Sequence, residues 1–286
     1  MEEKVKFGIN TFLFASPFTD KSLSILKDFK AMGFDGVEVA MENRGDFDPV
    51  RLLGALKDNG LECCSVCGAY GLDRDLRGTE EEQETSKRYI KDCIDACGEL
   101  ACDLFIGPHY SAVGRSRMET PEARKQQWAT VVRNLKEMCG YAEQKNVYLA
   151  LELLNRFETD FMNICADALR MIDAVGSPML KIHLDTFHMN IEEKSLPSAI
   201  LDAGDNLFHV HASENDRGAP GTGTVDWKGV KDALNRIGYS RYVVIESFTP
   251  DVEIIAKAAS IYRETEKSSS ALAQKGLDFL RALFAE

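Results

Sequence analysis

The chain has 286 residues, of which 44% are hydrophobic and 28% charged, and its formal net charge is −12. This composition is ordinary for a globular protein, and an acidic chain without a basic stripe argues against a nucleic-acid partner. No stretch approaches the roughly 18 consecutive apolar residues of a membrane span, and the N-terminal MEEKVKFGIN lacks the apolar run of a signal peptide. We therefore expect a cytoplasmic protein that binds neither nucleic acid nor membrane.

Short apolar segments alternate with longer amphipathic ones along the whole chain. Strand-like runs lie at 5–10, 36–40, 61–66, 102–107, 147–152, 180–185, 207–212 and 242–247. Helical periodicity lies at 20–33, 49–60, 80–100, 120–146, 164–176, 196–204 and 226–238, and again over about 251–285. This alternation without a linker predicts one α/β domain over residues 1–286, a single (β/α)8 TIM barrel with C-terminal helices. A doubly wound open sheet, the alternative, normally has fewer strands.

The cysteines could indicate a disulfide framework or a metal site. Cys64 and Cys67 form a C-x-x-C pair, but no second pair follows at the spacing of a zinc ribbon, and both lie in an apolar run. We expect reduced thiols that act as small buried apolar residues. A thioredoxin-like redox role is the less favoured alternative.

Four consecutive predicted strands each carry a polar residue at the carboxyl end. Apolar residues at every second position define the outward face of each strand, which leaves Glu152, Asp185, His211 and Glu246 inward in turn. The active sites of such barrels lie at this end. One carboxylate there is more often a helix cap or an ion-pair partner, but three that converge need a compensating cation. Three carboxylates and one imidazole suit Mn²⁺, Mg²⁺ or Co²⁺ better than a structural zinc.

Further polar residues lie near the same site. His183 points inward, two positions deeper than the aspartate of its strand, and we expect it to be hydrogen-bonded and not a ligand. Glu38 also points inward and could form a buried ion pair with Lys181. His109 and Tyr110 follow the fourth strand and are candidates for lining the pocket.

Several segments between residues 102 and 248 carry a family resemblance: GPHYSAVG, LALELLNRFETD, IHLDTFHMNIEE, HVHASENDRGAPGTGTVDW and VVIES. Here the chain resembles the ketose 3-epimerases, the D-tagatose and D-psicose (allulose) 3-epimerases, of the xylose-isomerase-like TIM barrels. The resemblance implies that Glu152, Asp185, His211 and Glu246 bind a divalent metal, for which we favour Mn²⁺ over Co²⁺ and Mg²⁺. It also implies a homodimer or homotetramer.

The resemblance further implies how a ketose is held. Glu158, His188 and Arg217 match residues that bind the sugar's hydroxyls, with His188 in a loop beyond the strand end. The first quarter of the chain matches less well, because INTFLFASPF stands where many family members have a segment rich in tyrosine that also bears tryptophan. We expect Phe12 and Phe14 to form the apolar wall there.

The expected reaction is C3 epimerisation of a free ketose of the D-tagatose, D-psicose or D-fructose type. A metal on the C2 carbonyl and C3 hydroxyl oxygens makes the C3 proton acidic enough to remove, which gives an enediolate. Reprotonation on the opposite face requires two acid–base groups, and Glu152 and Glu246, three strands apart, can flank the substrate. PGTGTVDW is a weak match to a phosphate loop, which favours a free sugar over a sugar phosphate.

Other functions of the same barrel stay open. An aldose–ketose isomerase, a hydroxypyruvate-type isomerase or an inosose dehydratase would use similar metal chemistry. A DNA-repair endonuclease would need more histidine ligands and a basic face, which this acidic chain lacks. A non-enzymatic sugar-binding protein is less favoured because the expected acid–base pair, Glu152 and Glu246, is intact.

Overall fold

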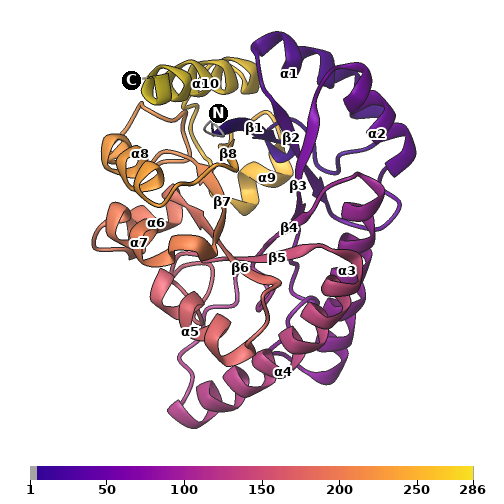
Figure 1. Cartoon of the computed structure of the whole chain (residues 1–286), viewed down its shortest axis with the longest axis vertical. Coiled ribbons are helices and arrows are strands. Elements are labelled where there is room, and N and C mark those ends of the chain that lie inside the picture. The colour runs from indigo at the N-terminus through magenta and orange to yellow at the C-terminus, as the bar shows by residue number, and fades with distance from the viewer. Residues whose placement is uncertain (1–4, 286) are drawn as a thin grey trace.

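The computed structural model describes residues 5–285, and this part of the chain forms a closed parallel barrel surrounded by helices (Figure 1). Each strand pairs with the next in sequence, and the last pairs with the first. The strands are β1 (Lys6–Asn10), β2 (Gly36–Met41), β3 (Glu62–Gly68), β4 (Leu104–Gly107), β5 (Tyr148–Glu152), β6 (Leu180–Asp185), β7 (Leu207–Ala212) and β8 (Tyr242–Ile245). Their ends agree with the sequence expectation to within two residues, so the predicted (β/α)8 barrel is confirmed.

The helices follow the predicted order with one addition. They are α1 (Leu26–Met32), α2 (Pro49–Asp58), α3 (Glu80–Glu99), α4 (Pro121–Lys145), α5 (Cys165–Val175), α6 (Thr186–Glu192), α7 (Leu196–Ala203), α8 (Trp227–Arg236), α9 (Glu253–Ala258) and α10 (Ser269–Ala285). Three short 3-10 segments join them: η1 (Thr11–Leu13), η2 (Asp20–Ile25) and η3 (Gly204–Asn206). The addition is α6, which begins directly at the end of β6. The expectation that His188 lies in a loop was therefore wrong.

Local sequence signals set several helix ends. The Thr79 hydroxyl accepts the backbone N–H of Glu82, whose carboxylate accepts the N–H of Thr79 in return, so α3 begins with a capping box. Helix α4 begins with Pro121, whose missing N–H is not needed in the first turn. Helices α1 and α5 end at Gly33 and Gly176, which both adopt the left-handed conformation.

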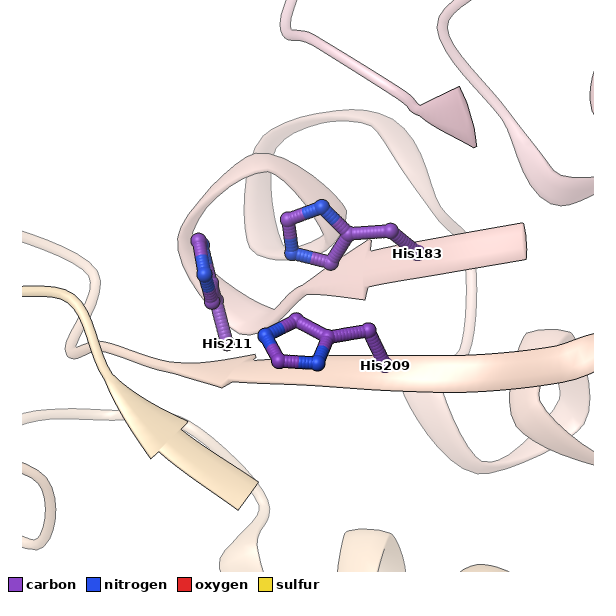
Figure 2. Close-up of side chains that lie close together, drawn as sticks. All are labelled: His183, His209 and His211. Atoms are coloured by element: carbon purple, nitrogen blue, oxygen red, sulfur yellow. The ribbon is translucent and has the colours of Figure 1, made fainter. Parts of the chain in front are cut away.

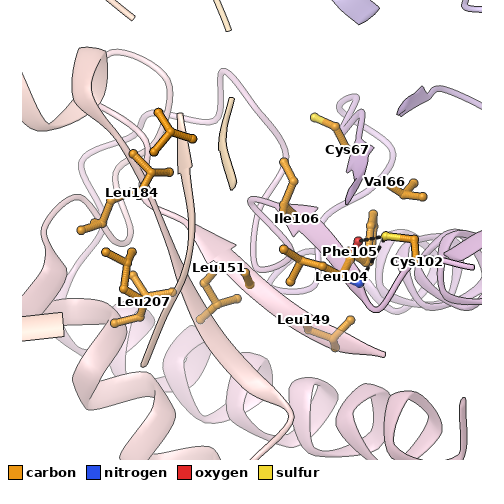
Figure 3. Packing of buried hydrophobic residues seen from close by; sticks show 14 of the residues in the cluster. Val66, Cys67, Cys102, Leu104, Phe105, Ile106, Leu149, Leu151, Leu184 and Leu207 are labelled. Carbon is orange, nitrogen blue, oxygen red and sulfur yellow. Dashed lines mark hydrogen bonds between the residues drawn. The ribbon is translucent and has the colours of Figure 1, made fainter. Parts of the chain in front are cut away.

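The core lies between the barrel and its helices, where the outward side chains of the strands pack. Figure 3 shows Leu149, Leu151 and Leu184 among the buried side chains of this layer, together with Cys102. The Cys102 thiol donates to the carbonyl of Leu104 at 3.4 Å. Every cysteine of the chain is free, and all except Cys63 are buried, as small apolar residues would be. The expectation of reduced thiols is confirmed.

The C-terminal helix α10 covers the junction of the last and first strands (Figure 1). The ring of Phe284 meets Phe7 of β1 with 5.6 Å between centroids, and Phe279 meets Trp227 of α8 at 5.8 Å. Among residues 5–285, no helix is both long and apolar enough to cross a membrane.

Candidate metal centre

Four polar side chains converge at the carboxyl ends of β5 to β8. Glu152 and Asp185 are the last residues of β5 and β6, His211 is next to last in β7, and Glu246 directly follows β8. One ligand atom from each lies within 4.8 Å of the others, and no more than 7% of any of these residues is exposed. The structure thus brings together the residues predicted to hold a metal.

Hydrogen bonding decides which nitrogen of His211 faces this acidic cluster. Its Nε2 lies 2.7 Å from Oε1 of Glu38, which also accepts from Asn10, so Nε2 carries a proton and donates it. Nδ1 lies 3.3 Å from Oε2 of Glu246 and has no hydrogen-bond partner among the described residues. In the neutral ring this nitrogen holds a lone pair, which a carboxylate repels and a cation attracts.

The pKa of His211 also indicates that its Nδ1 faces a position suited to a cation. Burial lowers the pKa of His211, but Glu38 and Glu246 at its two nitrogens raise it well above its usual value, so the ring tends to take up a second proton. A divalent ion would take the place of that proton on Nδ1. Three carboxylates and one imidazole fit Mn²⁺, Mg²⁺ or Co²⁺ by the chemistry of their donor atoms.

Glu152 and Glu246 differ in proton affinity although both are buried carboxyl groups. Burial and the nearby Glu246 raise the pKa of Glu152 well above its usual range. Burial acts on Glu246 in the same direction, but the positive charges of His211 and Arg217 more than offset it and lower the pKa of Glu246. Environments that separate two pKa values in this way favour one proton acceptor and one proton donor.

Arg217 lies directly against the acidic cluster. Its Nη1 donates to Oδ2 of Asp185 at 2.5 Å and to Oε2 of Glu246 at 3.0 Å. The guanidinium lies 4.0 Å from the ring centroid of Phe187, and the backbone φ of Arg217 is +63°, a conformation rare for residues other than glycine. Sequence reasoning assigned Arg217 to the sugar alone, whereas here it also balances the charge of two predicted ligands.

His188 and Glu158 lie beside the cluster and share Asn155 as a partner. The backbone N–H of Asn155 donates to Nδ1 of His188 at 3.1 Å, and its side-chain Nδ2 donates to Glu158 at 2.8 Å. Burial, followed by the charge of Arg217, lowers the pKa of His188 well below its usual value, so the ring is neutral. Nη2 of Arg217, which can only donate, lies 3.1 Å from Nε2 of His188. That nitrogen lies 3.6 Å from a carboxylate oxygen of Glu152. Burial also raises the pKa of Glu158.

Glu38 lies deeper in the barrel, below the cluster. It accepts a hydrogen bond from Asn10 Nδ2 at 2.7 Å, and the Nε2 atoms of His209 and His211 each lie 2.7 Å from one of its oxygens. Although burial raises the pKa of Glu38, His211 and His209 hold it well below its usual range. The ion pair with Lys181 that the sequence allowed does not form among residues 5–285, because His209 and His211 of β7 lie against Glu38 across the barrel interior instead. The H-x-H pattern of β7, which places His209 and His211 on the same inward face, was the sequence feature that could have indicated these partners.

Three imidazoles, those of His183, His209 and His211, pack against one another (Figure 2), and the third belongs to the cluster itself. The centroid of the His183 ring lies 4.1 Å from that of His211 and 5.0 Å from that of His209. The three could offer nitrogens to an ion, but His209 and His211 already contact Glu38. His183 is buried as expected, yet neither of its nitrogens has a hydrogen-bond partner among residues 5–285, so the expectation that it is hydrogen-bonded was wrong.

His109 and Tyr110 use their polar atoms away from the cluster. Nε2 of His109 lies 3.2 Å from the carbonyl of Phe105, and Nδ1 lies 2.6 Å from the hydroxyl of Tyr70, so a neutral ring satisfies both contacts. Burial lowers the pKa of His109 to about 3. The Tyr110 hydroxyl donates to the carbonyl of Met162 at 3.1 Å. Neither side chain makes a hydrogen bond or an ion pair with a predicted ligand in the part of the chain that the structure describes.

Phe12 and Phe14 follow β1 and are both half-buried. Phe14 packs on Phe29 of α1, with 4.8 Å between ring centroids, and borders a surface pocket of about 650 Å³ that Ile254 of α9 also lines. The backbone N–H of Phe12 donates to the side chain of Asn10 at 2.7 Å. Phe12 is thereby tied to the polar interior of the barrel, whereas Phe14 faces the outer layer.

Residues 26–283 match the protein family described as xylose isomerase-like TIM barrel. The chain is 33% identical to a probable ketose 3-epimerase of Synechocystis sp., over 98% of this chain and 97% of that protein. It is 30% identical to an L-ribulose 3-epimerase of Mesorhizobium japonicum, over 96% and 93% of the two chains. The crystal structure of D-allulose 3-epimerase from Methylomonas sp. in complex with D-allulose superposes with a TM-score of 0.90 at 26% identity and covers 98% of this chain and 97% of that chain.

Proposed function

The chain belongs to the xylose isomerase-like TIM barrel family, and we propose that it is a metal-dependent epimerase that inverts C3 of a free ketose. The similarity to ketose 3-epimerases over nearly the whole chain supports the reaction class. The observation that carries the proposal is the buried cluster of Glu152, Asp185, His211 and Glu246, with the free Nδ1 of His211 turned toward it. Mn²⁺ is our first choice of ion, and the substrate is of the D-psicose (allulose), D-tagatose, D-fructose or L-ribulose type.

Glu152 and Glu246 act as the acid–base pair in this proposal. Inversion removes a proton from one face of C3 and returns one to the other face, so it needs two groups on different strands. The opposite pKa directions of the two glutamates suit this exchange, with Glu246 as the initial base and Glu152 as the initial acid. Reaction in the reverse direction exchanges their roles. The bound metal would stabilise the negative charge that develops on the substrate during proton removal.

Three residues around the pair bind the sugar in this proposal. His188 orients C2 of the sugar and its oxygen through the Nε2 edge of its ring, which Arg217 also contacts, since its Nδ1 is already occupied by the N–H of Asn155. Arg217 offers a forked donor to neighbouring hydroxyls, and its left-handed backbone holds it at the mouth of the barrel. Glu158 accepts from a hydroxyl group.

We also propose that the chain is a single domain that assembles as a homodimer or homotetramer. Several large apolar side chains are exposed on connecting loops, and a contact between subunits would bury such side chains. They include Leu72, Met118, Phe157 and Tyr262, each at least 73% exposed. Size-exclusion chromatography with light scattering determines the assembly directly.

Incubation with ketoses in D₂O tests the proposed reaction. The Mn²⁺-loaded protein is mixed with D-fructose, D-tagatose, D-psicose or L-ribulose, and NMR locates the deuterium. Label at C3 together with the inverted epimer is the expected result. Label confined to C1 or C2 would indicate an aldose–ketose isomerase. Tight metal binding without exchange on any sugar would indicate a binding protein.

A further inference from the structure

Glu38 is the most fully engaged buried carboxylate near the metal centre. Its Oε1 accepts from Asn10 at 2.7 Å and from His211 at 2.7 Å. Its Oε2 accepts from the hydroxyl of Ser65 at 2.6 Å and lies 2.7 Å from Nε2 of His209. The residue is 0% exposed. Each oxygen of Glu38 thus accepts at least one hydrogen bond, and the imidazole of His209 lies beside them, so this arrangement provides the partners that a buried carboxylate charge requires.

We propose that Glu38 is a positioning residue of the metal centre, because it keeps the proton of His211 on Nε2 and so turns the lone pair of Nδ1 toward the ion. This inference rests on the metal site of the proposed function. A neutral imidazole has one N–H and one lone pair, and only the lone pair binds a metal. An anionic partner on the N–H also fixes the plane of the ring and makes the other nitrogen a better ligand.

Asn10 helps to orient a second predicted ligand, Glu246, through hydrogen bonds. Its Oδ1 accepts the backbone N–H of Phe12 at 2.7 Å, which prevents the amide from turning over. Its Nδ2 therefore faces two carboxylates, Glu38 at 2.7 Å and Oε1 of Glu246 at 3.2 Å. The other oxygen of Glu246 is left to face Nδ1 of His211. Strands β1 and β2, which supply no predicted ligand, thus orient one predicted ligand from β7 and one that directly follows β8.

The geometry defines what a Glu38→Gln substitution does. The amide oxygen must take the position of Oε1, because both groups there, Asn10 Nδ2 and His211 Nε2, are donors. The new NH₂ group then faces Ser65 and His209, which can each accept a hydrogen bond. The side chain keeps its volume and its contacts, but His211 loses its anionic partner. Metal affinity should therefore fall while the metal-free fold is retained.

Titration with MnCl₂ alone tests the inference. The expected result is a 10- to 100-fold lower Mn²⁺ affinity for Glu38→Gln than for the wild-type chain, the usual range for loss of such a partner. The cobalt-substituted variant should also show a shifted visible absorption spectrum, and its thermal unfolding in EDTA should match that of the wild type. Glu62→Gln is the control, because this exposed β3 carboxylate bonds Lys6 and Tyr242 instead. It should bind Mn²⁺ with wild-type affinity.

A second measurement needs no variant. Long-range ¹H–¹⁵N NMR of the five histidines in the Mg²⁺-loaded wild-type chain should show His211 protonated on Nε2 only. A proton on Nδ1, or wild-type Mn²⁺ affinity in Glu38→Gln, would overturn the role of Glu38 and leave the proposed epimerase intact. No Mn²⁺ binding by the wild-type chain would overturn both. Normal metal binding without epimerisation would overturn the proposed function alone.

Discussion

Two buried glutamates of one cluster, Glu152 and Glu246, have pKa values shifted in opposite directions because their neighbours differ. Replacement of either by glutamine removes a group that exchanges a proton with the substrate while it preserves the side-chain volume. We expect kcat to fall by about 10²- to 10⁴-fold in each variant, the usual contribution of a general acid or base. Chromatographic measurement of epimer formation at saturating Mn²⁺ checks this. Near-normal turnover in either variant would contradict the assignment of the pair.

Arg217 should affect metal and sugar in opposite directions. Its guanidinium bonds Asp185 and Glu246, two of the predicted ligands, so it competes with a cation for the same oxygens. In Arg217→Gln we expect Mn²⁺ to bind as tightly as in the wild type or more tightly. We expect kcat/KM for the ketose to fall about 10- to 100-fold, as loss of a charged hydrogen bond implies. Calorimetric titration and initial rates give the two values, and a parallel loss of both would mean that Arg217 only supports the fold.

His109 should make stability depend on pH. It is buried and neutral, and its pKa is about 3 in the folded protein against roughly 6.5 when unfolded. Between these values the unfolded chain binds a proton that the folded chain does not, so stability falls as the pH falls below about 6.5. From pH 7 to pH 5 the wild type should lose about 2 kcal/mol more unfolding free energy than His109→Gln. Urea unfolding at both pH values measures this difference, and equal losses would contradict the neutral state of His109.

At the level of single residues, the sequence predicts what depends on strand alternation. Glu152, Asp185 and His211 follow from counting inward positions on apolar strands, and they lie together as expected. The partner of Glu38 does not follow from such counting, because it depends on which residues meet inside the closed barrel. His211 is 173 positions away from Glu38 in the chain. The face of a strand on which a side chain lies follows from the neighbouring residues in the sequence. The residue that it contacts across the barrel interior does not.

Secondary-structure elements also differ in how well the sequence predicts them. Strands and long helices are predictable because each has an apolar repeat of sufficient length, whereas α6 spans only Thr186–Glu192. It begins where β6 ends, and the carboxylate of Asp185 caps it by accepting the N–H of Phe187 at 2.8 Å. One residue thus ends a strand, caps a helix and joins the predicted ligands. The sequence indicates each of these roles only weakly. Because Asp185 was assigned as a ligand, its role as a helix cap, and with it α6, was not predicted.

The loop from β7 to α8 is held together by Glu214, which is 0% exposed. Its Oε1 accepts from Nε1 of Trp227 at 2.6 Å and from the backbone N–H of Gly221 at 2.9 Å. A Cβ atom at Gly223 would lie 2.5 Å from its Oε2. Close packing around this carboxylate therefore accounts for a glycine of PGTGTVDW without any phosphate.

Glu214→Ala should loosen this loop, which also carries Arg217. The substitution leaves at least two buried N–H groups unpaired, and we expect a loss of about 2–4 kcal/mol in the free energy of unfolding. KM for the ketose should rise as well, because Arg217 loses its fixed position. Urea unfolding and steady-state kinetics measure the two effects. Glu214→Gln is the matched control, since its amide oxygen can still accept from Trp227 and should preserve most of the stability.

At the scale of the whole molecule, the candidate metal centre is built from strands that are far apart in the sequence. Predicted ligands come from β5, β6 and β7 and from the residue after β8, while Asn10 and Glu38 support them from β1 and β2. An ion bound by these residues would link β5 to β8, which Asn10 and Glu38 in turn connect to β1 and β2. Folding must assemble most of the barrel before the site exists, so metal binding should stabilise the chain as a unit.

Thermal unfolding with and without metal tests this coupling. An ion that binds only the folded chain at 100 times its Kd adds about 2.7 kcal/mol, which for a chain of this length is a rise of about 4–5 °C in Tm. The rise should appear in a single transition and disappear in excess EDTA. Asp185→Asn should abolish most of it, because the variant lacks one ligand charge, while the surface variant Glu62→Gln should keep it. An equal rise in Asp185→Asn would mean that Mn²⁺ stabilises the chain from another site, and two separate transitions would mean that the halves of the barrel unfold independently.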